Sequence, residues 1–341
     1  MRKLRRAGLA TTALLLAACS SAPGPAAPQP VTVAIAGDVH FAGSSAAALE
    51  PGGLDAVAPL LREADLTVVN VETAITDGGE PAGKQYTFRA PAAGLGALRD
   101  AGVDVAAMAN NHSLDYGRTG LEDTLQAGRD EGLPVIGLGQ DVDAAFAPHR
   151  TTVRGTTIAV FDATQVIDGS LATAWTATAD RPGLASVQTA SGRQRLAAAV
   201  QAERERSDSV VVVLHWGREL QDCPTQDQED LAAELVAAGA DAVVGSHAHL
   251  QLGQGYLRSG DRTGFVDYGL GNFVFYAKKA VTVETGVLEL TLPAAGGVPR
   301  ARWRPATIES GVPVPLEGSA ADEAVRHKES LRACTDLAAA P

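Results

Sequence analysis

Apolar and polar positions alternate along the chain with two different periods. Runs of consecutive apolar, often β-branched residues predict buried strands at 31–39, 66–75, 104–110, 134–139, 156–164, 209–217 and 241–247. Apolar residues recur at helical spacing in the intervening segments 53–64, 90–101, 120–132 and 188–206. A further helix is expected to begin at Thr225, where Gln228 completes a capping box. Strands that alternate with helices predict a layered α/β domain with buried, largely parallel strands.

The pattern changes after His249. Strand-like runs follow one another at residues 262–276, 285–292 and 301–309, with no helical spacing between them. They predict a second sheet whose strands are antiparallel. Residues 314–341 lack a clear period, so we expect them to form a tail on the surface and the domain to span residues 31–313.

The first residues have the pattern of a targeting segment. Residues 1–18 begin with basic residues and continue with an apolar stretch too short to span a bilayer, which indicates a lipoprotein signal peptide. Leu16-Ala17-Ala18-Cys19 resembles a bacterial lipobox, so Cys19 is expected to carry lipid and to hold the protein to the cell membrane on its extracytoplasmic face. An ordinary secretory signal with a chance cysteine is the alternative. Residues 19–30 are rich in proline and predict a stiff tether.

Charge and cysteine content narrow the classes of partner. The formal net charge is −12, and without residues 1–18 the chain keeps 24 basic and 40 acidic residues, a balance of −16. This balance argues against nucleic acid as a partner. In an oxidising compartment Cys223 and Cys334 would form one disulfide. Two free buried thiols remain the alternative, because the sequence does not give the distance between the two Cα atoms.

Polar residues cluster where the predicted strands end, which in open α/β sheets is where ligands bind. Five of the seven histidines fall there. The residues at these ends are Asp38, His40, Asn70, Glu72, Asn110, Asn111, His112, His215, His247 and His249. Several pairs have i, i+2 spacing, which in extended backbone points both side chains to one side.

This set of side chains has the chemistry of a metal site. One such histidine alone is better explained as a structural imidazole, but five at neighbouring strand ends favour a shared site. Carboxylates, an amide and imidazoles are ligands that Mn, Fe or Zn accept. They are numerous enough for two divalent ions, and in two-metal sites a bridging carboxylate holds both ions while an activated water serves as the nucleophile.

Six ordered segments carry a resemblance to a known family. They are GDVH (37–40), NVET (70–73), ANNHSLDYG (109–117), LHWG (214–217), GSHAH (245–249) and YGLGNFVF (268–275), with FRAP (88–91) as a further element. The chain thereby resembles the CapA family of poly-γ-glutamate capsule biosynthesis proteins, a branch of the calcineurin-like metallophosphoesterase superfamily. The resemblance implies a four-layer α/β/β/α metallophosphatase-like sandwich.

The resemblance also implies roles for individual residues. It assigns one ion to Asp38, His40 and His249, the other to Asn111, His215 and His247, and the bridge to Glu72. His112 becomes the candidate general acid, and Asp115 is expected to orient it. Two departures stand out: Asn70-x-Glu72 replaces the aspartate bridge usual in the superfamily, and His40 is retained where many CapA-like sequences have an apolar residue.

Three further residues have weaker assignments. Arg89 could bind a substrate carboxylate or phosphate in a bidentate manner, and a salt bridge explains it equally well. Asn272, in a glycine-rich loop, is expected to contact substrate. Trp216 directly follows His215 and is expected to pack beneath the site rather than to stack on a ligand.

These observations favour a lipid-anchored, extracytoplasmic, metal-dependent hydrolase of the metallophosphatase type. The resemblance connects it with capsule or poly-γ-glutamate processing, and its expected substrate is an anionic envelope polymer or a phosphoester. The alternative is a non-catalytic component that binds or exports the polymer within a capsule synthesis complex. A soluble nucleotidase is disfavoured, because the fifteen aromatic residues form no obvious pair that could clamp a base.

Overall fold

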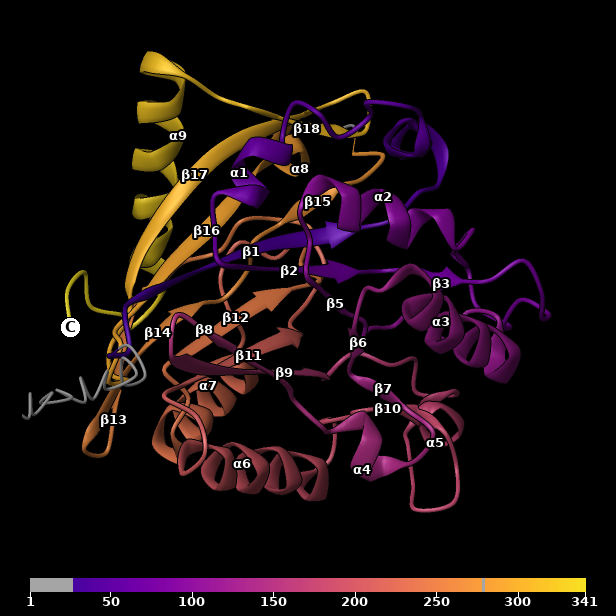
Figure 1. Cartoon of the computed structure of the whole chain (residues 1–341), viewed down its shortest axis with the longest axis horizontal. Coiled ribbons are helices and arrows are strands. Elements are labelled where there is room, and N and C mark those ends of the chain that lie inside the picture. Colours follow the sequence, from indigo (N-terminus) through magenta and orange to yellow (C-terminus); the bar gives the residue numbers. More distant parts are fainter. Residues whose placement is uncertain (1–26, 278–279) are drawn as a thin grey trace, which may run out of the picture.

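The computed structural model describes residues 27–277 and 280–341 and shows a mixed α/β protein with two main sheets (Figure 1). The predicted signal peptide, Cys19 and most of the predicted tether lie outside the described residues. Among the helices of the described residues, none combines the length and the apolar character needed to cross a membrane.

The first sheet is built around β1, whose neighbours come from both ends of the chain. Its strands, in spatial order, are β18 (Val312–Pro315), β17 (Arg300–Glu309), β16 (Glu284–Leu292), β1 (Val31–Val39), β2 (Leu66–Val71), β5 (Val105–Ala107) and β6 (Val135–Ile136), and the short β15 (Asn272–Val274) also pairs with β1. The strands from β1 to β6 run parallel, whereas β16, β17 and β18 add in antiparallel fashion.

The second sheet has a parallel centre and antiparallel edges. Its strands, in spatial order, are β13 (Gln254–Ser259), β14 (Arg262–Asp267), β12 (Ala242–Ser246), β11 (Ser209–His215), β9 (Thr156–Thr164) and β8 (His149–Val153). The strands β9, β11, β12 and β14 are parallel. The arrowheads of β1, β2, β11 and β12 point to the same side of the molecule, so their carboxyl ends share one edge (Figure 1).

Apolar side chains fill the space between the two sheets, and further apolar side chains cover the outer face of each sheet. Val33 and Ile35 of β1 pack in one buried cluster with Val160 of β9, Val211 of β11 and Val244 of β12. Such strands are covered on both faces, which explains their continuous apolar runs. The helices over the first sheet are η1 (Gly43–Leu49), α1 (Ala58–Arg62), α2 (Ala93–Ala101) and α3 (Gly117–Glu131), and those over the second are α6 (Ala190–Arg204) and α7 (Gln226–Ala238) (Figure 1).

Two predicted strands are interrupted in the structure. The run 66–75 divides into β2 and β3 (Ala74–Ile75), and β3 pairs with β4 (Arg89–Ala90) outside the main sheets. The run 134–139 divides at Gly137, which has a φ of 83°, so that β6 and β7 (Leu138–Gly139) belong to different sheets. The remaining short elements are α4 (Val142–Ala145), α5 (Ala172–Trp175) and β10 (Gly183–Leu184), which pairs with β7.

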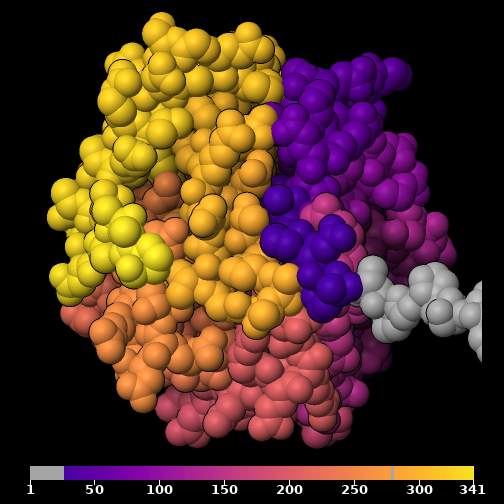
Figure 2. Space-filling view, turned by 60° about the vertical axis from the view of Figure 1, so that its left-hand side comes forward, coloured from indigo at the N-terminus to yellow at the C-terminus, as the bar shows by residue number. Residues whose placement is uncertain are grey.

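The C-terminal third differs from its prediction. Helices do not end at His249, since α8 (Ala280–Val283), α9 (Gly318–Ser330) and η2 (Leu331–Cys334) follow. The late strands also form no sheet of their own: β14 joins β12 in parallel, and β16 extends the first sheet. The spacing of apolar residues did not predict α9, because the one buried residue of this helix is Lys328 and the helix therefore has no apolar stripe. In Figure 2 the yellow C-terminal residues lie on the surface, next to the orange part of the chain.

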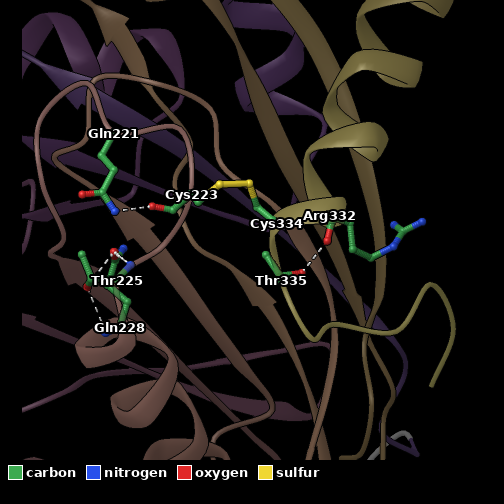
Figure 3. Close-up of a disulfide and its surroundings, with 7 residues drawn as sticks. All are labelled: Gln221, Cys223, Thr225, Gln228, Arg332, Cys334 and Thr335. Carbon is green, nitrogen blue, oxygen red and sulfur yellow. Dashed lines mark hydrogen bonds between the residues drawn. A yellow bond between two sulfur atoms is a disulfide. The ribbon is translucent and has the colours of Figure 1, made fainter.

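Two strong contacts fasten this C-terminal segment. The Nζ atom of Lys328 donates hydrogen bonds to Leu252 O, Asp267 Oδ1 and Gly269 O at 2.9, 2.9 and 3.0 Å. A disulfide joins Cys334 to Cys223, which lies in the loop between β11 and α7, and the two Cα atoms are 5.4 Å apart (Figure 3). The disulfide interpretation of the cysteine pair is therefore confirmed.

Candidate metal centre

The site begins where β1 ends. A Cβ atom at Gly37 would collide with the carbonyl oxygen of Gly271, and the N–H of Asp38 donates to that same oxygen at 3.1 Å. The strand register shifts at Asp38 on both sides of β1. Close approach of the two backbones, which only glycine permits, thus buries the Asp38 carboxylate at the sheet edge.

Two groups of side chains converge beside Asp38, and they share one residue. Asp38, Glu72 and His249 form the first group, and Glu72, His215 and His247 the second. Within each group the potential ligand atoms lie within 4.8 Å of one another. Glu72 comes from the end of β2, so its carboxylate occupies the position between the two groups.

Several buried polar atoms of this cluster have no hydrogen-bond partner. They are both carboxylate oxygens of Glu72, Nδ1 of His247 and Nε2 of His40. Oε1 of Glu72 does lie 3.3 Å from Nε2 of His215, but without hydrogen-bond geometry. Buried polar atoms are almost always paired, so unpaired acceptors gathered at one edge fit a site that holds a cation.

The electrostatics of the cluster are set by burial and by charge pairing. Burial raises the pKa of Glu72, but the imidazoles of His215 and His249 lower it, and the net pKa lies below its usual range. Burial lowers the pKa of His249, whereas the Glu72 and Asp38 carboxylates raise it to about 9. A protonated His249 therefore supplies positive charge that a bound cation would otherwise supply. Burial also lowers the pKa of His247 well below its usual value, so its imidazole stays neutral, the form that binds metals.

His40 lies beside the two groups rather than within them. Its ring stacks with Phe88 at a centroid distance of 4.9 Å and contacts Phe275 and Tyr276 at 3.9 and 4.6 Å. Nδ1 of His40 lies 2.9 Å from the hydroxyl of Ser45, and burial lowers the pKa of His40 to about 3. The N–H of Ala42 also donates to Nδ1 at 3.1 Å, so the neutral ring of His40 is held in place while its Nε2 has no partner.

Asparagines connect the strand ends. Oδ1 of Asn111 lies 2.8 Å from Nε2 of His215, so the structure brings Asn111 to the second group. Nδ2 of Asn70 donates to Oδ1 of Asp38 at 2.8 Å. Nδ2 of Asn110 donates to the carbonyl of Val71 at 2.8 Å, which ties the loop after β5 to β2.

His112 forms a chain of contacts with Asp115 and Lys84. Nδ1 of His112 lies 2.7 Å from Oδ2 of Asp115, and Nζ of Lys84 lies 2.8 Å from Oδ1 of the same carboxylate. Lys84 also donates to the carbonyl oxygen of Asn111. No sequence pattern selects Lys84, because it lies in a loop without periodicity and contacts Asp115 from 31 positions away.

The remaining predicted residues divide by location. Asn272 contacts the cluster, with Oδ1 at 2.9 Å from Nδ1 of His249. Arg89 is exposed, and its guanidinium lies 4.9 Å from the ring centre of Tyr116. Because Phe88 faces His40, its neighbour in the extended backbone points away from the cluster. Trp216 is fully buried and donates to Tyr268 O, as expected for a packing residue.

The backbone at His247 and His249 corrects one prediction. β12 ends at Ser246, and the two histidines have left-handed backbone conformations with φ values of 92° and 55°. The expectation of an extended strand through His247 is therefore wrong. The two imidazoles still meet at Glu72, but from different groups.

Comparisons with known proteins place this site in a family context. The family model described as "Bacterial capsule synthesis protein PGA_cap" matches residues 32–277. "Capsule biosynthesis protein CapA" of Bacillus anthracis is 30% identical over 269 residues, which cover 76% of this chain and 62% of that protein. "PGA biosynthesis protein CapA" of Bacillus subtilis (strain 168) is 27% identical over 286 residues, or 82% and 70% of the two chains. The match thus spans less than two thirds of the Bacillus anthracis relative.

A solved structure supports the fold. A crystal structure described as a novel phosphatase, with Mycoplasma pneumoniae in its title, aligns with 87% of this chain and 97% of its own length. The TM-score is 0.52 at 12% sequence identity. At this identity the likeness shows a phosphatase-like fold and leaves the reaction open.

Proposed function

The chain belongs to the bacterial capsule synthesis protein family PGA_cap, and from that membership we propose that it is a metal-dependent hydrolase of the metallophosphatase type. The observation that carries the proposal is the shared position of Glu72, whose buried oxygens lack hydrogen-bond partners and belong to both ligand groups. A buried carboxylate without hydrogen-bond partners is costly, so its retention fits a role as a bridge between two cations. We class the fold as a four-layer α/β/β/α metallophosphatase-like sandwich.

The proposed ligand sets extend the two groups by His40, which lies beside them, and by Asn111, which contacts His215. Asp38, His40 and His249 would hold one ion, and Asn111, His215 and His247 the other, with Glu72 between them. The donor atoms are carboxylate and amide oxygens and imidazole nitrogens, which suit Mn, Fe or Zn. When bound, such ions supply Lewis-acid stabilisation and an activated water.

The chain itself supplies the proton chemistry. The Asp115 carboxylate accepts a hydrogen bond from Nδ1 of His112. The same carboxylate is held by Nζ of Lys84 at 2.8 Å and by the N–H of Phe88 at 2.6 Å. A carboxylate fixed in this way keeps the imidazole oriented with a proton on Nδ1. In its imidazolium form, with a proton on each ring nitrogen, His112 can then give the Nε2 proton to the leaving group.

The proposed substrate is an anionic envelope polymer such as poly-γ-glutamate, or a phosphoester linked to one. We further propose that Cys19 anchors the protein to the extracytoplasmic face of the cell membrane, where it would act beside or within a capsule synthesis complex. Cations at the centre would attract an anionic substrate to a chain whose formal net charge is −12.

The test combines metal analysis with hydrolysis by the purified full chain. We expect bound Mn, Fe or Zn, and turnover of bis-p-nitrophenyl phosphate or of poly-γ-glutamate. Glu72→Gln should lose both metal and turnover, whereas His112→Ala should keep the metal and slow turnover by about 10²–10⁴-fold. His327→Gln is the matched control, because His327 pairs with Glu284 outside the site.

Two results would contradict the proposal. A purified protein that binds no divalent metal would remove the basis for the ligand sets. Full metal occupancy without turnover of either substrate would instead favour the non-catalytic polymer-binding or export component.

A further inference from the structure

A polar cavity lies at the same edge of the second sheet as the metal centre. Its volume is about 590 Å³. It is lined by the end of β9, the start of α6, the loop after β11 and the start of α7, and the residues that matter here are Gln165, Arg193, Gly217, Arg218, Gln226 and Asp227.

The cavity adjoins the backbone of a residue in the second ligand group. In the sheet His215 pairs with Thr164, and the N–H of the next residue, Gln165, donates to the carbonyl oxygen of His215 at 2.9 Å. Gly217 follows His215 by two positions and also lines the cavity. The cavity is therefore lined by residues that adjoin His215, Gln165 in the sheet and Gly217 along the chain.

The two arginines give the cavity its charge. Arg218 is exposed, and its guanidinium makes no hydrogen bond or ion pair within the described part of the chain. Arg193 has Asp227 as its ion-pair partner at 3.5 Å, and the side chain of Asp227 is 76% exposed, so this pair is weak. Nε of Arg193 also donates to the carbonyl oxygen of Val187 at 3.4 Å, which leaves the rest of its guanidinium to the cavity. Two guanidiniums with few partners in one cavity are suited to an anion.

The helix that borders the cavity adds to this effect. α7 has 13 residues, and the amide groups of its first turn, including Gln226 and Asp227, have no acceptor within the helix. The positive end of the helix dipole favours an anion at this point. The amides alone would not define a site, but they point to the same place as the two arginines.

The loop that carries Arg218 is held at several points. The N–H of Leu220 donates to the carbonyl of Ala248 at 2.9 Å, and Cys223 is tied to Cys334 by the disulfide. Figure 3 shows this disulfide together with the Thr225–Gln228 capping box at the start of α7. A loop fixed at both ends presents Arg218 with little loss of conformational entropy on binding.

We propose that this cavity, the arginine pocket, binds the carboxylate groups of an acidic polymer while the polymer's scissile bond lies at the metal centre. This inference rests on the proposed function and specifies its substrate class. Guanidiniums bind carboxylate and phosphate in the same forked geometry, so the shared chemistry is that of an oxyanion. None of the proposed ligand residues lines the arginine pocket, so a ligand that reaches both the pocket and the metal centre has to be extended.

The experiment measures the affinity of the full chain for a γ-glutamate decamer by fluorescence anisotropy at low ionic strength. We expect Arg218→Gln and Arg193→Gln each to weaken binding by about tenfold, since each removes a charge-assisted hydrogen-bond donor. Arg258→Gln on the exposed edge strand β13 is the matched control, because it changes the net charge equally and should leave the affinity unchanged. Melting temperatures verify that all three variants are folded.

Three outcomes would overturn the inference. Unchanged affinity in both pocket variants would do so, and an equal loss in Arg258→Gln would show a net-charge effect alone. Tighter, arginine-dependent binding of a glycerol-phosphate oligomer of equal length would overturn the assignment to carboxylates. Failure of the proposed function is seen separately, as absence of turnover by the wild type. Glu72→Gln should still bind the decamer in an arginine-dependent way, although it should not hydrolyse it.

Discussion

Substitution of Lys328 by methionine tests how the C-terminal helix is held. The side chain is fully buried, and its Nζ atom lies 2.9 Å from both oxygens of Asp267 and donates to the carbonyls of Leu252 and Gly269. Methionine has a similar volume but no charge. The variant would therefore leave the Asp267 carboxylate and two carbonyl oxygens without their donor.

The expected loss of stability is large. Removal of one partner of a buried ion pair costs about 3–5 kcal/mol, because the other charge stays buried and unpaired. The loss should also depend on pH. Burial raises the pKa of Asp267 to about 6 even though Lys328 opposes the shift, and the pKa rises further once Lys328 is gone. A carboxyl whose folded-state pKa is raised loses stability as the pH rises from its unfolded pKa to its folded pKa. The wild type's free energy of unfolding should therefore stop falling above the folded-state pKa of Asp267. That of the variant should continue to fall by about 1.4 kcal/mol per pH unit, because its folded-state pKa is higher.

The measurement is urea unfolding of both proteins between pH 5 and pH 8. Arg326→Met is the matched control, since it removes an exposed cation from the same helix and should change the free energy of unfolding little. Asp267→Asn added to Lys328→Met should recover part of the loss, because the unpaired charge is then absent. A loss below about 1 kcal/mol that does not vary with pH would refute the reasoning, since it would mean that Asp267 finds water or another partner.

Three further predictions follow from the disulfide, the ligand groups and a second buried carboxyl. The double variant Cys223→Ser/Cys334→Ser should lose about 4–5 kcal/mol of the free energy of unfolding by the chain-entropy account, because the disulfide spans 111 residues. Urea unfolding with and without reductant measures this loss, and equal stability would contradict the prediction. His247→Ala and His249→Ala should each lower bound metal, measured by elemental analysis, and the residual metal should occupy different positions; complete loss in each single variant would leave the two-group assignment unsupported. Burial raises the pKa of Asp162 well above its usual value, so the wild type should lose stability as the pH rises from about 4, and Asp162→Asn should flatten this dependence in thermal melts; parallel curves would count against it.

The strands that the sequence predicted best are those covered on both faces. β1, β9 and β11 lie where continuous apolar runs placed them, because each packs between a helical layer and the opposite sheet. The capping box of α7 was also predicted, since it depends only on Thr225 and Gln228, three residues apart. Local patterns thus sufficed wherever the stabilising contacts were local or uniformly apolar.

Prediction failed where a few distant contacts decide the structure. The helix α9 is fastened by the Lys328–Asp267 pair, 61 positions apart, and by the following disulfide, neither of which leaves a periodic pattern. Lys84 was missed for the same reason, since its contact with Asp115 is set by the path of a loop. The histidines and carboxylates at strand ends, and Asp115 beside His112, could be selected from sequence, whereas Lys84 and Ser45, which contact Asp115 and His40, could not.

The two histidines at the end of β12 show why spacing alone could not give the geometry of the site. In an extended strand, residues two apart project to one side, and His247 and His249 would then compete for one position. Left-handed backbone at a non-glycine residue costs about 1–3 kcal/mol and persists only where the surroundings determine it. Here the N–H of His247 lies 3.3 Å from a carboxylate oxygen of Asp38, and Nδ1 of His249 lies 3.1 Å from the same oxygen. These two residues, both with left-handed backbone, thereby direct one imidazole to each ligand group. Glycine at either position would relieve the strain, but it would also remove the imidazole.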